Sequence, residues 1–366
     1  MALSIGIVGL PNVGKSTLFN ALTRSQIAEA ANYAFCTIEP NSAVVPVPDP
    51  RVEELAEMVR PEKTIHATVV FTDIAGLVEG ASRGEGLGNQ FLAHIRESNA
   101  IVHVVRCFED EEVSHVHGTV NPVRDISVIE TELLLADIQT VEKRIDKLQR
   151  QVTNDKSVRP LLDLASALQS HLSSGDPAST FEAGRDQPST RFCDELFLLT
   201  AKPVIYCANV GEGALQGEDP PVSVVRDYAR ERGAIAVTIS ARIEDEISGL
   251  EDEERSDFLR SYGVTDSGLD QVIRGGYAAL DLISFLTAGP KEVRAWTVPR
   301  GTSAPAAAGA IHSDFERGFI RAEVIAYEDF VRHGSETACR AAGVARVEGR
   351  DYVIEDGDVV HFRFNV

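Results

Sequence analysis

The residues between Gly9 and Thr17 have the types and spacing that bind a chain of phosphates. Gly9 is followed by four residues and then by Gly14, Lys15 and Ser16, which is the spacing of a P-loop. In such a loop backbone N–H groups point at the anion, the lysine reaches the β- and γ-phosphates, and the serine hydroxyl binds Mg2+. We therefore expect Lys15 to be catalytic and Ser16 to be a metal ligand. The expected phosphate contacts are Asn12, Val13, Gly14, Lys15, Ser16 and Thr17.

The sequence around this loop predicts the elements that the motif requires. The apolar run before Gly9 predicts a buried strand, and Ser16 to Arg24 predicts a helix with Leu18 and Leu22 on one side. The positive end of the helix dipole would then face the bound anion.

Two further segments supply candidate metal and γ-phosphate contacts. A predicted strand, Thr68 to Asp73, ends in Asp73-Ile-Ala-Gly76. The Asp73 carboxylate would help to hold Mg2+, and the Gly76 N–H would donate to the γ-phosphate. Thr37, in a segment without helical or strand periodicity, is either a third metal ligand that senses the γ-phosphate or an ordinary loop threonine.

A late strand is followed by residues that can contact the base. Guanine-selective P-loop proteins carry Asn-Lys-x-Asp there, whereas this chain has Asn209, Val210, Gly211 and Glu212. Without the lysine and with a longer carboxylate, strict GTP selectivity is not expected, and Asn209 with backbone groups could satisfy the N6 donor and N1 acceptor of adenine, so ATP is a candidate substrate. A GTP-preferring or dual-specificity enzyme is the alternative. The next predicted strand, Ala234 to Ser240, is followed by Ala241. We expect Ser240 and Ala241 to close the base pocket.

Hydrolysis needs a polar group that orients the attacking water, and the position that usually supplies this group is apolar in this chain. Many related enzymes place a water-orienting glutamine just after Asp-x-x-Gly, but this chain has Leu77. The nearest polar candidates are His115 and His117, in the loop that follows the predicted strand from Ala100. Asn12 could help to hold a monovalent cation such as K+ beside the phosphates.

The segment 126–200 predicts an antiparallel helical hairpin. Apolar residues recur at alternating intervals of four and three positions, as in a coiled coil. A second apolar stripe follows after Asn154 and Asp155. The tip is locally basic, which suits RNA, although solvated helix charges are an equally good explanation. The basic residues are Lys143, Arg144, Lys147, Arg150, Lys156 and Arg159.

Alternating strand and helix signals predict a doubly wound, mostly parallel α/β sheet for residues 1–125 and 201–281, which would form the nucleotide-binding domain. Residues 282–366 carry short apolar runs separated by turns, and we expect four or five strands around one helix in a small α+β domain. The predicted organisation is thus three domains, with the hairpin inserted into the first.

The composition narrows the class of protein. The chain of 366 residues has a formal net charge of -21, so RNA contact must come from a local patch, and we expect no recognition of DNA sequence. Five scattered cysteines suit a reducing compartment and indicate no zinc site. We find no export pattern and no long apolar segment, and we expect a cytoplasmic protein without a membrane.

These motifs together resemble the Obg-like ATPases, the YchF group of the translation-factor class of P-loop GTPases. The resemblance covers essentially the whole chain and is carried by Gly9 to Thr17, Asn32 to Asn41, Asp73 to Gln90, Asn209 to Glu212 and Phe315 to Val366. It implies ATP hydrolysis in preference to GTP, an inserted coiled coil, a C-terminal β-grasp domain of the TGS type, and association with ribosomes. It also implies a catalytic histidine, by position His115, although His117 stays open.

A different class of function competes with the enzyme. In that alternative the nucleotide gates an adaptor that binds the ribosome or RNA, and turnover is negligible. Leu77 favours this alternative.

Overall fold

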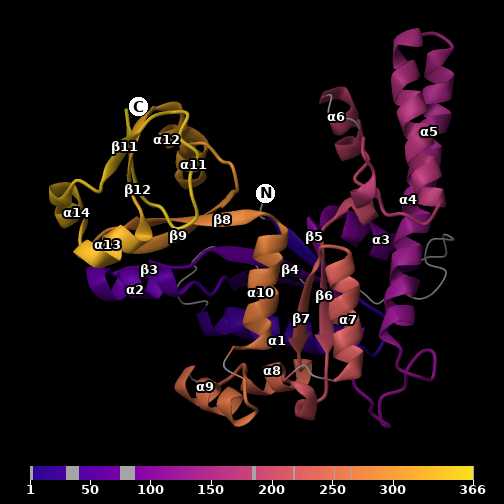
Figure 1. The fold of residues 1–366 in the computed structure, drawn as a ribbon, viewed down its shortest axis with the longest axis horizontal. Helices are drawn as coiled ribbons and strands as arrows, with labels where there is room; N and C mark the ends of the chain where they lie inside the picture. The colour runs from indigo at the N-terminus through magenta and orange to yellow at the C-terminus, as the bar shows by residue number, and fades with distance from the viewer. Residues whose placement is uncertain are drawn as a thin grey trace. The chain divides into compact units, whose positions relative to one another are not determined.

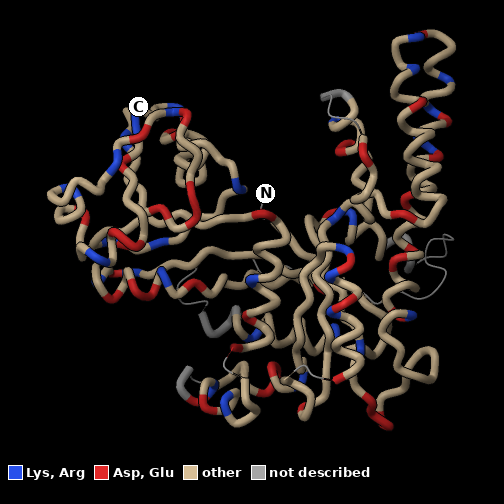
Figure 2. Tube along the Cα trace, viewed as in Figure 1, with Lys and Arg blue, Asp and Glu red and all other residues tan. Residues whose placement is uncertain are grey.

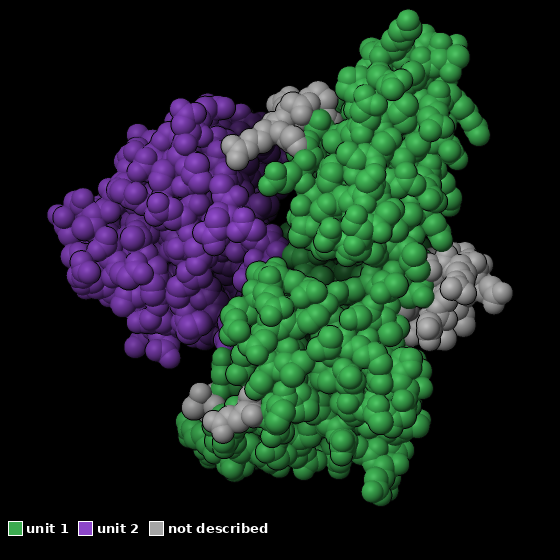
Figure 3. All heavy atoms as spheres, turned by 45° about the vertical axis from the view of Figure 1, so that its right-hand side comes forward, with its two compact units in different colours: residues 1–22, 39–43, 71–272 green, residues 23–38, 44–70, 273–366 purple. Residues whose placement is uncertain are grey.

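The structure is a computed structural model that describes residues 3–29, 41–74, 87–183, 187–216, 219–250, 252–264 and 266–365. Its contacts divide into two compact units (Figure 3). Residues 1–22, 39–43 and 71–272 form unit 1, and residues 23–38, 44–70 and 273–366 form unit 2. Each unit has a buried hydrophobic core of its own.

The nucleotide-binding fold is built on a six-stranded sheet in the order β2-β4-β1-β5-β6-β7. The pairs β1 with β5, β5 with β6, and β6 with β7 are parallel. Every residue of β5 is buried, as expected for a central strand of such a sheet. The predicted doubly wound fold is confirmed. The strands are β1 (Ser4–Val8), β2 (Ser42–Pro46), β4 (Thr68–Asp73), β5 (Ala100–Arg106), β6 (Val204–Asn209) and β7 (Ile235–Ile239).

Helices lie between these strands and after the last of them along the chain (Figure 1). The helix predicted for Ser16 to Arg24 is longer in the structure and extends to Glu29, since no glycine or proline follows Arg24 to end it earlier. The helices are α1 (Lys15–Glu29), α3 (Leu87–Glu97), α7 (Pro220–Glu231), α8 (Ala241–Ile247), α9 (Asp252–Ser261) and α10 (Gly268–Ala279).

The inserted hairpin is confirmed and consists of α4 (Pro122–Val152) and α5 (Arg159–Ser173), which lie side by side in Figure 1. Asn121 begins α4 by accepting a hydrogen bond from the Arg124 N–H, next to Pro122 at the first helical position. A third helix, α6 (Gln187–Glu195), packs against the pair. The shared core contains Val141, Ile145, Leu148, Ala165, Leu168, Leu172 and Phe192.

The second sheet has the order β11-β10-β12-β8-β9-β3. Its strands are β3 (Lys63–Ile65), β8 (Leu282–Ala288), β9 (Glu292–Pro299), β10 (Phe319–Ile325), β11 (Arg346–Glu348) and β12 (Val359–Phe364). The helices of the same unit are α2 (Pro50–Val59), α11 (Ala304–Ile311), α12 (Ser313–Arg317), α13 (Tyr327–His333) and α14 (Glu336–Ala342). The α+β class is confirmed. The expected single helix is wrong, because α12, α13 and α14 are too short for periodicity to reveal.

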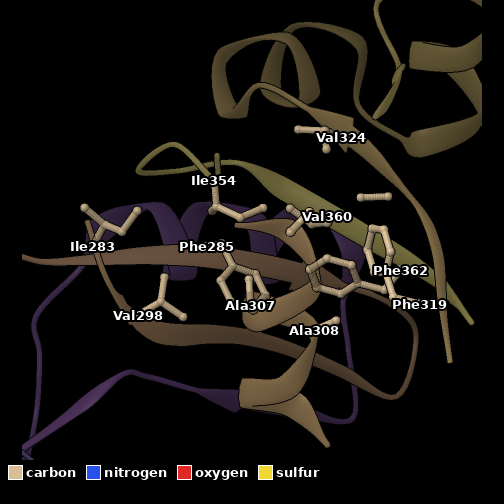
Figure 4. Packing of buried hydrophobic residues seen from close by; sticks show 12 residues of the cluster. Ile283, Phe285, Val298, Ala307, Ala308, Phe319, Val324, Ile354, Val360 and Phe362 are labelled. Carbon is tan, nitrogen blue, oxygen red and sulfur yellow. The ribbon is translucent and has the colours of Figure 1, made fainter. Parts of the chain in front are cut away.

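A cluster of aromatic and aliphatic side chains holds this sheet to α11 (Figure 4). Phe285 meets Phe362 edge to face at 5.7 Å between ring centres, and Ala307 and Ala308 of α11 are fully buried. Small alanine side chains let the helix approach the sheet closely.

Two observations bear on the expected organisation. Residues 44–70, which we expected in the first domain, group with 273–366, because β3 pairs in parallel with β9. The three domain boundaries stay a prediction. Within the described ranges, no helix has the length and apolar character needed to span a membrane.

Candidate nucleotide-binding site

The phosphate loop turns sharply between β1 and α1. Gly14 has φ of +100°, and a Cβ at this position would overlap Asn209 Nδ2. A Cβ on Gly9 would lie 2.5 Å from the Val104 carbonyl oxygen. Both positions therefore require glycine, as the P-loop spacing predicts.

Lys15 follows this loop as the first residue of α1 and is 8% exposed. Its ammonium group donates to the Leu10 carbonyl oxygen at 2.7 Å. Burial lowers the pKa of Lys15 to about 8, and the nearby Asp73 carboxylate opposes that shift. Burial, with a smaller effect of Lys15, lowers the pKa of the neighbouring His103 to about 3, so this imidazole is neutral at physiological pH.

Asp73 ends β4 beside the loop, where a metal ligand was predicted. Burial raises the pKa of its carboxyl group, and the positive charge of Lys15 opposes that effect. Ser16, at the start of α1, is exposed. A hydroxyl and a carboxylate are hard oxygen ligands of the kind that Mg2+ prefers. The described residues contain no cluster of three or more His, Cys, Asp or Glu that could hold a metal by themselves. Thr37, Gly76 and Leu77 lie outside the described residues.

Asn209 joins the phosphate loop to the base corner. Its side-chain amide donates to the Val13 carbonyl oxygen at 2.8 Å, and its side-chain oxygen accepts from the Ala241 N–H at 3.0 Å. Ser240 is 1% exposed, and its hydroxyl has no hydrogen-bond partner among the described residues. A buried hydroxyl without a partner is one that a bound base could satisfy.

Val210 and Glu212 lie in different surroundings. Val210 is 3% exposed and belongs to the core beneath the sheet. Glu212 is on the surface, and its carboxylate pairs with Arg242 at 3.4 Å, while Arg242 also contacts Glu246. Arg242 was not among the predicted site residues, although its place directly after Ala241 was a usable signal. The carboxylate expected to face the base therefore already has a cationic partner.

The histidine loop is tied to the phosphate loop. Asn12 has φ of +62°, a conformation that asparagine tolerates, and its side-chain amide donates to the Ser114 carbonyl oxygen at 3.2 Å. The next residue, His115, lies 2.8 Å from Asp125, from Nε2 to Oδ2. The His117 Nε2 atom is buried and has no partner among the described residues.

The structure thus brings most of the predicted residues to one edge of the first sheet. They lie at the carboxyl ends of β1, β4, β6 and β7 and in the loop after β5. Ligands of open α/β sheets bind at this edge. Asp125 was missed, because its contact with His115 depends on how α4 packs and leaves no local pattern.

Comparisons with known proteins agree with this geometry. The family described as "50S ribosome-binding GTPase" matches residues 4–157, and the family YchF-GTPase_C, described as "Protein of unknown function (DUF933)", matches residues 282–365. Proteins named "Ribosome-binding ATPase YchF" from Haemophilus influenzae and Bacillus subtilis are 52% and 50% identical over the full length of both chains. The solved structure of the Schizosaccharomyces pombe YchF GTPase has a TM-score of 0.89 and 39% identity, covering 99% of this chain and 97% of that one.

Proposed function

This chain belongs to the YchF family, and we propose that it is a ribosome-associated P-loop nucleoside triphosphatase that hydrolyses ATP in preference to GTP. One observation carries the proposal. The loop from Gly9 to Gly14 closes against Asn209, and the buried Lys15 that follows it donates its ammonium group to the Leu10 carbonyl oxygen of the loop. That arrangement can surround a triphosphate chain with backbone N–H groups and one ammonium group.

The preference for ATP rests on the base corner. Val210 is buried and offers no lysine stem to stack on a base, and the carboxylate of Glu212 is paired with Arg242. Guanine would have to compete with Arg242 for that carboxylate, whereas adenine brings an acceptor at N1. Asn209, Ser240 and Ala241 complete the proposed contacts with the base.

The proposed metal ligands are Ser16, Asp73 and Thr37, with Mg2+ as the ion. When bound, Mg2+ would neutralise charge on the β- and γ-phosphate oxygens. Gly76 would donate its N–H to the γ-phosphate. Asn12 is the proposed support of K+, although its side-chain amide is engaged with Ser114 in this conformation.

The proposed catalytic groups are Lys15, which stabilises charge on the phosphates, and a histidine that orients the attacking water. By position this is His115. His117 is the alternative, because its buried Nε2 has no hydrogen-bond partner among the described residues. Separate His115→Ala and His117→Ala variants distinguish the two. The catalytic histidine is the one whose loss lowers turnover while ATP affinity is retained.

We propose that the hairpin tip contacts ribosomal RNA. Lys147 and Arg150 are exposed near the end of α4, and Lys156 is exposed in the turn. Figure 2 shows, however, that Lys and Arg mix with Asp and Glu along the hairpin. A Lys147→Glu variant should bind ribosomes more weakly and with a shallower salt dependence. The matched reversal Lys291→Glu, outside the hairpin, should not, and equal binding of the two variants would remove the hairpin from the proposal.

The proposed organisation keeps residues 1–125 and 201–281 as the nucleotide-binding domain, 126–200 as the insertion, and 282–366 as a TGS-like domain. We also propose a cytoplasmic location, because ribosomes are the partner.

The test is ATP and GTP turnover with and without purified ribosomes, with Lys15→Ala as the inactive control. We expect faster ATP than GTP turnover and stimulation by ribosomes. Faster GTP turnover would reverse the base assignment. Negligible turnover with ribosomes and K+ present, together with intact nucleotide binding, would favour the adaptor. Nucleotide binding that survives Lys15→Ala would contradict the site itself.

A further inference from the structure

Both ring nitrogens of His115 are engaged in this structure. Nδ1 accepts a hydrogen bond from the His117 backbone N–H at 3.1 Å, and Nε2 lies 2.8 Å from Asp125 Oδ2. The His115 side chain is 5% exposed and that of Asp125 is 3% exposed. An accepting Nδ1 carries no proton, so the proton of the neutral ring is on Nε2 and is donated to Asp125.

This arrangement leaves His115 without a free acceptor. A group that orients an attacking water needs a lone pair within hydrogen-bond reach of that water. Here the one lone pair of the ring is used by a backbone N–H, and the ring N–H is used by a carboxylate. His115 must leave these partners before it can act on a water molecule.

We propose that Asp125 is a positioning residue that holds His115 in this withdrawn orientation, so that displacement of α4 releases the histidine for catalysis. The inference rests on the proposed catalytic role of His115. It adds that the activity of the site is regulated, and that the regulating contact is made by the Asp125 carboxylate in the first turn of α4.

Asp125 is well placed for this role. It is 2% exposed, and its other oxygen, Oδ1, accepts from Arg124 Nε at 3.1 Å and Nη2 at 3.0 Å. Because the carboxylate is fixed by its own helix, its position follows that of α4. A rigid helix that begins at Pro122 and ends at Val152 can carry a displacement from the hairpin tip to its first turn.

A chain of contacts connects this carboxylate to the phosphate loop. Asn12 of the loop donates to the Ser114 carbonyl oxygen, Ser114 precedes His115, and His115 donates to Asp125. A partner that moves the hairpin would act on the histidine, and a nucleotide that moves Asn12 would act on the same loop.

Farther along α4, a second carboxylate provides a control. Glu130 accepts hydrogen bonds from Tyr206 at 2.6 Å and Tyr228 at 2.7 Å. It therefore anchors the same helix to the same domain, but no contact joins it to His115 among the described residues. Glu130→Gln is therefore a change of the same kind on the same helix that leaves the contact between Asp125 and His115 in place.

The experiment measures ATP turnover of the full chain without ribosomes. Asp125→Asn keeps the shape of the side chain and removes its charge, so the hold on His115 weakens. We expect basal kcat to rise at least about fivefold with little change in KM, and ribosome stimulation to shrink correspondingly. The double variant with His115→Ala should cancel the rise, and Glu130→Gln should not produce it.

Several outcomes would overturn the inference. Basal turnover that is unchanged, or that falls to the level of His115→Ala, would mean that Asp125 does not hold the ring back. A rise that persists in the double variant, or an equal rise in Glu130→Gln, would mean that it acts elsewhere. A separate result would show that His115 is not catalytic. In that case His115→Ala would keep full turnover with ribosomes.

A second measurement does not depend on a variant of Asp125. In the wild-type protein, 15N NMR of labelled histidines should show His115 as the Nε2–H tautomer with slow exchange of that proton. The signal is assigned by its loss in His115→Gln. A ring with mixed tautomers and rapid proton exchange would overturn the inference.

Discussion

The phosphate end and the base end of the proposed site are built differently. The phosphate end consists of backbone turns that require glycine and of a lysine that is 8% exposed. The base end depends on Asn209 and on an ion pair between Glu212 and Arg242 whose side chains are 44% and 74% exposed. Backbone geometry allows little adjustment, whereas an exposed ion pair can rearrange at small cost. We conclude that recognition of a triphosphate is fixed more firmly than the choice of purine.

The largest effect is expected at the phosphate end. Gly14→Ala places a Cβ against Asn209 at a positive φ, which by itself costs about 1 to 2 kcal/mol. Because Asn209 must also move, we expect ATP affinity, measured by isothermal titration calorimetry, to fall at least about a hundredfold. Gly249→Ala is the control, since a Cβ there would meet nothing within 4 Å. An ATP affinity of Gly14→Ala within a factor of a few of the control would break the comparison.

Asn209 tests the connection between the two ends. Asn209→Ala leaves the Val13 carbonyl and the Ala241 N–H unpaired, so the free energy of unfolding should fall by about 1 to 3 kcal/mol. Urea denaturation measures this change. Asn209→Asp keeps the acceptor for Ala241 and loses the donor for Val13, so it should lie between wild type and alanine. Equal stability of all three proteins would show that the two ends are independent.

The pH dependence of ATP binding tests the burial of Lys15. A bound triphosphate favours the charged lysine, so its pKa in the complex exceeds the value of about 8 in the free protein. Binding then takes up a proton above pH 8, and ATP affinity should fall by up to about tenfold per pH unit between about pH 8 and 9.5. Lys15→Arg should bind more weakly but without this slope. A flat wild-type profile would contradict the lowered pKa.

The same lowered pKa has the opposite sign for folding. The unfolded chain, with a lysine pKa near 10.5, binds more protons than the native chain once the pH exceeds about 8. The contribution of Lys15 to stability therefore improves as the pH rises through this range.

The smallest effect is expected at the base end. Arg242→Gln frees the Glu212 carboxylate to accept from guanine, so the ratio of GTP to ATP affinity should rise, by at most about fivefold because the ion pair is exposed. Fluorescent-nucleotide competition gives both dissociation constants. Glu246→Gln breaks the other ion pair of Arg242 and is the control. A ratio that falls, or that changes equally in the control, would remove Arg242 from base selection.

Local patterns were sufficient for much of the fold and part of the site. Glycine spacing predicts the phosphate loop, and a seam of spacing three and four predicts the hairpin of α4 and α5, because neighbours in sequence make those structures. The short helices α12, α13 and α14 were not predicted, since fewer than two or three turns give no measurable period.

By itself the sequence determined that a tight turn with glycine at Gly9 and Gly14 follows a buried strand, because glycine positions and apolar runs act within one segment. Only the tertiary structure decided that β3 pairs with β9, that Arg242 contacts Glu212, and that Asp125 contacts His115. The physical reason is that each of these contacts joins residues whose distance in space depends on the packing of other elements.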